Sequence, residues 1–233
     1  CHSTHLQKNY IPETDSFHTT FDEINVSCEA CHGPGSKHLE WAELPSSRQN
    51  NIENYGLIAQ TSGIDNVAYV NLCARCHTRR MQIGDFNHEF VDLLDIMTPT
   101  LLLEDYHPDG QILDEDYVFG SFTQSKMYHT DIKCNDCHNV HSGERHFEGN
   151  QLCFQCHTPD YYGSDKHHFH KNTGADGKPL IIDGKEVAIG EGASCVNCHM
   201  PAQFYMGIDS RNDHSIRIPR PDLSKDLGVP NAC

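Results

Sequence analysis

The sequence contains little apolar material for its length. Hydrophobic residues make up 37% of the 233 residues, and there is a single Trp. The best candidate for an apolar run, residues 93–103, contains Asp95 and Pro99 and is much shorter than the roughly 20 residues that span a bilayer. The sequence therefore predicts no membrane span in this segment. It also predicts a thin side-chain core, so another group should fill the interior.

Positive charge is also scarce. The 17 Lys and Arg residues stand against 33 Asp and Glu residues, which gives a formal net charge of −16. Such a surface repels nucleic acids and anionic membranes, so neither is expected as a partner. Simple hydration of the surface explains the acidity better than a dedicated docking patch.

Cysteine and histidine, in contrast, are abundant, with 12 and 18 residues. A chain rich in both residue types is first of all a candidate for binding metal or haem. Ten of the Cys residues belong to five complete copies of Cys-x-x-Cys-His, numbered here motifs 1 to 5. The motifs are Cys28, Cys31 and His32; Cys73, Cys76 and His77; Cys134, Cys137 and His138; Cys153, Cys156 and His157; and Cys195, Cys198 and His199.

The spacing within each motif suits covalently attached haem. Two thiols three residues apart lie on one side of a helical turn, where each can form a thioether with one haem vinyl group. The His that follows can then bind the iron as its proximal ligand. Zinc sites do not need a His directly after each Cys pair, and a redox Cys-x-x-Cys would not recur five times. Haem c is therefore the predicted cofactor, with zinc ribbons and local disulfides as alternatives.

The two remaining Cys residues stand at the ends of the sequence. Cys1-His2 has the second thiol and the proximal His of a sixth motif, and Cys233 has the first thiol of a seventh. We expect a sixth haem at Cys1-His2 and a seventh site beginning at Cys233. We also expect the sequence to be a piece of a longer chain. Head-to-tail assembly of copies that share haems at their junctions is the second explanation.

Twelve further His residues are enough to give every iron a second, distal imidazole. The distal candidates are His5, His38, His129, His141, His167, His168, His170 and His214. The remaining His18, His88, His107 and His146 are expected to face solvent. The surplus of His favours low-potential bis-His haems over His/Met ligation, for which Met81, Met97, Met127, Met200 and Met206 could compete.

Position along the chain distinguishes some of these candidates. His141 and His5 each lie three residues after a proximal His, on one helical face with it, so each should reach a neighbouring iron. A Gly-Pro-Gly turn folds the chain back before His38. One or two of the His residues at 167–170 should bind iron, and a carboxylate near His214 could orient its ring.

The predicted fold class is mainly α, with much irregular loop and a small β-hairpin, in a multihaem cytochrome c architecture whose haems form the core. Short helices should carry the motifs, with others near residues 36–44 and 121–130. Asp183-Gly184 between two apolar runs predicts a hairpin at 178–189, and residues 111–119 form a candidate strand. We treat residues 1–233 as one multihaem domain, with any subdivision falling near 105–120.

Several runs resemble a family of large bacterial multihaem cytochromes that often carry tetratricopeptide repeats after the haem region. The runs are Cys1–Tyr10, Cys28–Ala42, Asp109–Ile112, Gly120–Met127, His167–His170, Cys198–Pro201 and Arg211–Leu223. More distantly, Cys-His-Gly-Pro-Gly-x-x-His is similar to the hydroxylamine oxidoreductase and cytochrome c-554 group. The resemblance implies electron transfer in the periplasm or outside the cell, with other redox proteins or further haem domains as partners.

Two functions fit these observations. The first is electron transfer through closely spaced, mostly bis-His haems, with no catalytic residue. The second is an oxidoreductase that acts on a small inorganic nitrogen or sulfur compound at one haem with an open distal position. The surplus of His favours electron transfer, and no motif has Lys in place of its His.

Overall fold

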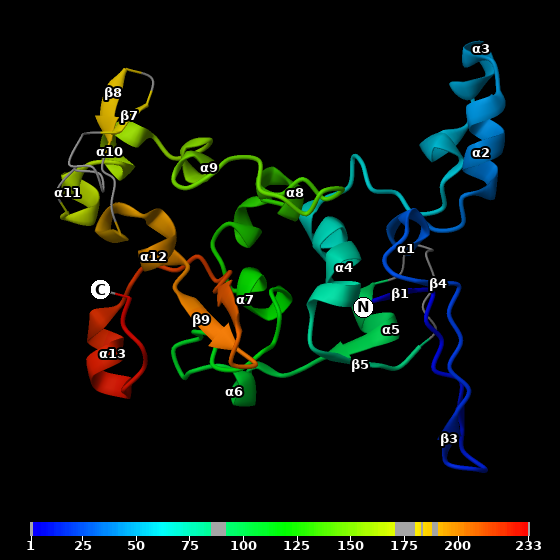
Figure 1. Cartoon of the computed structure of the whole chain (residues 1–233), viewed down its shortest axis with the longest axis horizontal. Coiled ribbons are helices and arrows are strands. Elements are labelled where there is room, and N and C mark those ends of the chain that lie inside the picture. The colour runs from blue at the N-terminus through cyan, green and yellow to red at the C-terminus, as the bar shows by residue number, and fades with distance from the viewer. Residues whose placement is uncertain (1, 85–91, 171–179, 183, 188–190, 233) are drawn as a thin grey trace. The chain divides into compact units, whose positions relative to one another are not determined.

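The computed structural model describes residues 2–84, 92–170, 180–182, 184–187 and 191–232. The chain divides into two compact units, Cys1–Thr100 and Leu101–Cys233. Short helices and two-stranded antiparallel sheets make up both units (Figure 1). No helix among the described residues is long and apolar enough to cross a membrane.

The first unit contains three small sheets and five α-helices among its described residues. Strands β1 and β4, β2 and β3, and β5 and β6 pair with each other. The elements in chain order are β1 (Ser3–Thr4), β2 (Tyr10–Ile11), β3 (Ser16–Phe17), β4 (Glu23–Ile24), α1 (Cys28–His32), α2 (Ser36–Glu43), α3 (Ser46–Gln49), the 3₁₀ helix η1 (Glu53–Gly56), α4 (Asn66–His77), β5 (Arg80–Gln82), α5 (Leu93–Ile96) and β6 (Met97–Pro99).

The second unit contains eight α-helices and two sheets among its described residues, β7 with β8 and β9 with β10. The elements in chain order are α6 (Leu102–Asp105), α7 (Phe119–Thr123), η2 (Tyr128–Thr130), α8 (Cys134–Cys137), α9 (Gln151–Phe154), α10 (Pro159–Tyr162), α11 (Asp165–His168), β7 (Leu180–Ile182), β8 (Lys185–Val187), η3 (Glu191–Ala193), α12 (Cys195–His199), β9 (Ala202–Tyr205), β10 (Asp209–Asn212) and α13 (Pro221–Leu227).

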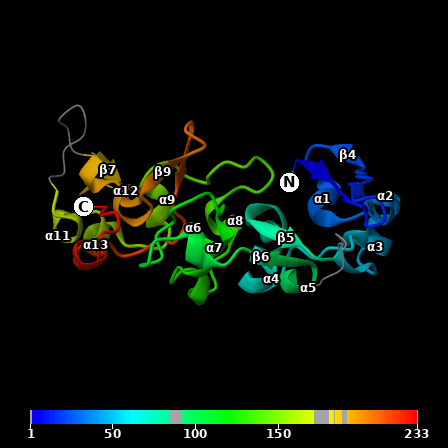
Figure 2. The same cartoon turned by 90° about the horizontal axis from the view of Figure 1, so that it is seen from below.

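Each unit buries only a small apolar core. In the first, Leu93 and Met97 are almost fully buried where α5 and β6 pack beside α4, an arrangement visible in both views (Figures 1 and 2). In the second, a buried cluster consists of Tyr106, Ile112 and Tyr205. The small extent of these clusters among the described residues agrees with the prediction of a thin side-chain core.

The exposed surface is correspondingly large. The chain of 26.3 kDa exposes 15155 Å². Even two separate compact bodies of half that mass would together expose only about 13,000 Å². Large apolar side chains contribute to the surplus, among them Leu103 at 88% and Ile208 at 86% exposure. This surface is suited to packing against large apolar groups.

Most of the predicted elements are confirmed. Helices α1, α4, α8 and α12 contain motifs 1, 2, 3 and 5 up to at least the second Cys, and α9 begins motif 4. The helix predicted at 36–44 is α2, and the region 121–130 contains the end of α7 and η2. Strands β7 and β8 form the predicted hairpin, whose residues 178, 179, 183, 188 and 189 lie outside the described part.

Two structural predictions need correction. Residues 111–119 do not form a strand: the backbone carbonyl of Asp105 accepts the N–H groups of both Leu113 and Asp114, which folds the chain back. Tyr117 has a φ of 57°, and Phe119 begins a helix. The number of small sheets also exceeds the prediction: the sequence predicts one hairpin, and the described residues form five two-stranded sheets.

Candidate haem-binding site

Local hydrogen bonds shape each motif as a single helical turn. In motif 3, the N–H of His138 reaches the carbonyl of Cys134 at 3.0 Å, and in motif 4 that of His157 reaches Cys153 at 3.0 Å. These are i to i−4 bonds of the α-helical type, which place the two Cys side chains on one side and the His just after them. Helix α4 begins at its N-cap Asp65, whose carboxylate accepts the N–H of Ala68.

Two distal candidates of the first unit have an oriented ring. The Nδ1 atom of His38 lies 2.9 Å from the carbonyl oxygen of Tyr55. The Nδ1 atom of His5 lies against a carboxylate oxygen of Asp22. Metal-bound His residues commonly donate one ring N–H to such an acceptor, which fixes the ring and turns the other nitrogen to the metal. In His38 this bond leaves Nε2 available.

A buried cation of motif 2 lies within electrostatic reach of motif 1, and the sequence alone gave no sign of it. Arg75, between the Cys residues of motif 2, is only 6% exposed. Burial lowers the pKa of its guanidinium, and the nearby thiols of Cys31 and Cys76 oppose this effect. Burial likewise raises the pKa of Cys31, against the influence of Arg75. Arg75 therefore lies within electrostatic reach of motifs 1 and 2.

In the second unit, two proximal His residues each have a distal candidate beside them. The ring centres of His138 and His214 are 6.4 Å apart, with planes inclined by 26°. Those of His199 and His167 are 6.0 Å apart, with planes inclined by 9°. A third pair, His168 and His170, has a separation of 6.2 Å and an angle of 21°.

Backbone carbonyls orient two of these rings. The Nδ1 atom of His199 is 2.7 Å from the carbonyl oxygen of Arg217, and that of His214 is 2.9 Å from that of Asn212. Both bonds leave Nε2 for another partner. In His168 the roles differ, because the backbone N–H of His170 donates to Nδ1, which places the proton of the neutral ring on Nε2.

Burial also favours the neutral form of two distal candidates. Burial lowers the pKa of His214, opposed by the Asn212 carbonyl and by Asp213. Burial lowers the pKa of His167 as well, and its neighbours His199, His168 and His157 act in the same direction. A neutral imidazole is the form that binds a metal.

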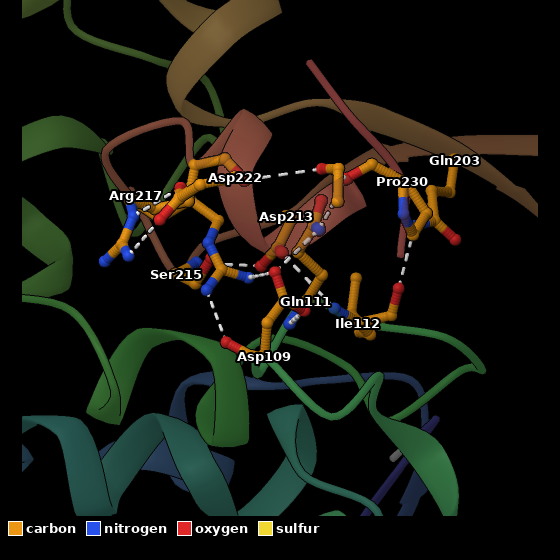
Figure 3. Close-up of polar contacts among 11 residues, drawn as sticks. Asp109, Gln111, Ile112, Gln203, Asp213, Ser215, Arg217, Asp222 and Pro230 are labelled. Atoms are coloured by element: carbon orange, nitrogen blue, oxygen red, sulfur yellow. Dashed lines mark hydrogen bonds and ion pairs between the residues drawn. The ribbon is translucent and has the colours of Figure 1, made fainter. Parts of the chain in front are cut away.

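The carboxylate beside His214 acts differently from the prediction. Asp213 is 3% exposed, but its oxygens accept backbone N–H groups, from Ser215 at 2.8 Å and from Ile112 at 3.3 Å (Figure 3). The ring of His214 instead bonds to the carbonyl of Asn212. Asp213 thus fixes the backbone just after His214 and ties this segment to Ile112, and it does not orient the ring itself.

Further contacts join this segment to distant parts of the unit. The Arg217 guanidinium donates to the carbonyl of Asp109, and the side chain of Gln111 donates to the carbonyl of Pro230 at 2.8 Å (Figure 3). Gln203 donates to the carbonyl of Ile112 at 2.7 Å. Two of the runs quoted above for the family resemblance, Asp109–Ile112 and Arg211–Leu223, therefore lie against each other.

The surroundings of the other His residues differ from those of these pairs. His129 and His141 are exposed, and the ring of His129 lies beside Tyr128. His146, expected to face solvent, is exposed, and its Nε2 bonds to the carbonyl of Asn135. His2 is also exposed. Cys1, Cys233 and His88 lie outside the described residues.

The thiols of the second unit lie close together. The Cys195 thiol hydrogen-bonds to the sulfur of Cys153, which lowers the pKa of Cys153 to about 7 and raises that of Cys195. Burial raises the pKa of Cys137, and the neighbouring Cys153 and Cys156 raise it further. Motifs 4 and 5 are therefore in contact, and motif 3 lies within electrostatic reach of motif 4.

These residues fit covalent haem. Each described motif offers two thiols on one side of a turn and a His directly after them, and two of the proximal His residues face a second His. The exposed apolar side chains are suited to packing against a porphyrin.

Comparison with solved structures reveals the same architecture in a known protein. The crystal structure of the outer cell wall cytochrome OcwA matches this chain over its full length, with a TM-score of 0.62 and 17% sequence identity. The chain shares its fold with an outer cell wall cytochrome. It spans 58% of the length of that protein.

No family model and no curated protein sequence matches the chain. At 17% identity the likeness to OcwA concerns the fold alone. The resemblance to cytochromes with tetratricopeptide repeats and to the hydroxylamine oxidoreductase group therefore stays a prediction.

Proposed function

We propose that this chain transfers electrons through five covalently attached c-type haems, held closely together and mostly ligated by two His residues. The haem group, when bound, supplies the one-electron chemistry of its iron. The protein holds the group by thioethers, provides the axial imidazoles and sets the distance between neighbouring sites. The observation that carries this proposal is the spacing of two His pairs, His138 with His214 and His199 with His167.

The spacing of these pairs suits an iron between two imidazoles. With metal–nitrogen bonds of about 2.0 Å, and a ring centre about 1.2 Å behind each nitrogen, two opposed ligands have centres about 6.4 Å apart. The observed separations are 6.4 and 6.0 Å. Aromatic rings in direct contact can also have centres about 6 Å apart. A second criterion is therefore needed to identify the pairs that could bind an iron.

Sequence separation supplies the second criterion. His138 and His214 belong to distant segments, as do His167 and His199, so a porphyrin can lie between the members of each pair. His168 and His170 have a similar spacing but are only two residues apart. Their short connection cannot pass around the edge of a porphyrin. We therefore assign His214 as the distal ligand for motif 3 and His167 as that for motif 5, and exclude the pair His168 and His170.

The proposed surroundings are the cell envelope or the extracellular space. Thioether-linked haem is installed outside the cytoplasmic membrane, where thiol-rich chains are matured. The structural neighbour is an outer cell wall cytochrome, which supports an extracellular location over a periplasmic one. As partners we propose other redox proteins or further haem domains, met through a strongly acidic surface.

The attachment of haem is tested directly by mass and absorbance. After full denaturation the purified protein should keep its haem absorbance, because the thioethers survive loss of the fold. Its mass should exceed that of the polypeptide by one haem for each of the five described motifs, and by a sixth if Cys1-His2 is used. Zinc in place of porphyrin in this mass surplus would contradict the proposal.

Arg75 should raise the reduction potential of the haems at motifs 1 and 2. Its buried positive charge opposes the extra positive charge of the ferric state. In the variant Arg75→Gln we expect one or two haems to titrate at lower potential. A unit charge about 10 Å from the iron shifts the potential by roughly 70 mV at an effective dielectric constant of about 20.

The matched control for this prediction is Arg79→Gln, which removes an exposed charge two residues after motif 2. Solvent screens a charge at the surface, so this variant should titrate like the unaltered protein. Potentiometric titration followed by absorbance compares the three proteins. Equal shifts in both variants would show that burial of Arg75 has no special effect.

A further inference from the structure

One side chain ties motif 4 to motif 5. Asn150 precedes α9, and its backbone carbonyl accepts the N–H groups of Cys153 at 3.0 Å and Phe154 at 3.1 Å. Its side-chain amide binds two backbone groups that lie 43 and 45 residues further along the chain. The Nδ2 atom donates to the carbonyl of Ala193 at 2.8 Å, and Oδ1 accepts the N–H of Cys195 at 2.9 Å.

Asn150 binds the backbone of two Cys residues, each of which should carry haem. The carbonyl of Asn150 begins the turn that holds Cys153, the first Cys of motif 4. Its Oδ1 atom holds the N–H of Cys195, the first Cys of motif 5. The two thiols are themselves within hydrogen-bonding contact. These sulfur atoms are the ones that become thioethers, so the haem edges attached to them should lie together.

The chemistry of asparagine suits this position. A short primary amide offers a donor and an acceptor at once, and Asn150 uses both on groups two residues apart. Asp would keep the acceptor but would turn a second oxygen to the Ala193 carbonyl. Ala would remove both bonds and leave the N-terminus of α12 without its contact to motif 4.

We propose that Asn150 is a positioning residue that holds the haem edges at Cys153 and Cys195 against each other, so that these two haems exchange electrons directly. This inference rests on the proposed function, because it assumes haem at both motifs. It goes further by assigning a specific neighbouring pair within the relay and the residue that sets its spacing.

Spin coupling between the two ferric haems tests this inference. Two paramagnetic haems in edge contact shift and broaden each other's electron paramagnetic resonance signals. In the oxidised holoprotein with Asn150→Ala, we expect the coupled signal of one pair to be replaced by the signals of two isolated low-spin haems. Electron redistribution after flash reduction should lose one of its fast phases, although the haem content stays at five.

A control variant separates this effect from a general loss of order. Asn9 also makes two side-chain hydrogen bonds, to the carbonyl of His18 and to the hydroxyl of Thr20, in a hairpin that contains no haem motif. Asn9→Ala should leave the coupled signal unchanged. Unchanged coupling in a fully haem-loaded Asn150→Ala protein would overturn the inference, whereas absence of haem from the unaltered protein would overturn the proposed function.

A second variant decides the case if Asn150→Ala does not mature. Asn150→Asp keeps the acceptor for the Cys195 N–H and places a negative charge against the Ala193 carbonyl. The contact should loosen without being lost, so we expect the coupled signal to weaken. Coupling equal to that of the unaltered protein would overturn the role assigned to Asn150.

Discussion

Replacing His214 by Ala should turn one haem of the protein high-spin and leave every haem attached. The thioethers and His138 still hold the group at motif 3, but the ring 6.4 Å from His138 is gone. The same result is expected for motif 5 in His167→Ala, because His167 faces His199. In each variant one low-spin haem should become high-spin, which absorbance and electron paramagnetic resonance both measure.

Matched controls are available within the same unit. His168 is adjacent to His167, but its Nδ1 accepts a backbone N–H, and among the described residues its ring stacks near-parallel with that of His170. His146 is exposed and bonds to the carbonyl of Asn135 through Nε2. His168→Ala and His146→Ala should therefore stay fully low-spin. A high-spin haem in His168→Ala together with a low-spin His167→Ala would reverse the assignment.

The proximal half of each site could be predicted from the sequence because it is local. Two thiols and a His within five residues need only one helical turn, and the structure forms that turn at each of the five motifs. The distal half could not be predicted with the same certainty. His214 is 76 residues from His138, and only the folded chain brings them together. Sequence spacing indicated a cluster at 167–170 but did not distinguish His167 from His168.

The residues that hold the sites in place could not be predicted from the sequence. Asn150, Asp213 and Arg217 act on backbone groups far along the chain, and such contacts follow no fixed spacing. Asp213 was suspected as a partner of the His214 ring because it is adjacent in sequence. The structure uses it to fix the backbone instead. Arg75 was overlooked since a charged residue between two Cys residues is normally expected to face solvent.

Without haem the chain should lose most of its ordered structure. The described α-helices are short, and only α4 reaches 12 residues. Isolated helices below about 12–15 residues are marginal in water, so packing must stabilise them. The buried clusters here are small, and two-stranded sheets are marginal without a packed face. We therefore expect the haems proposed at the five motifs to supply most of the packing surface.

The test compares the same sequence produced with and without the c-type maturation system. The haem-free chain should show a weak helical circular dichroism signal, no cooperative thermal transition and fast amide exchange at α8, α9 and α12. Any remaining protection should lie in α4, α5 and β6, where Leu93 and Met97 are buried by side chains alone. If the haem-free chain instead unfolds cooperatively with native-like protection at all five motifs, side-chain packing suffices and the haems are not the core.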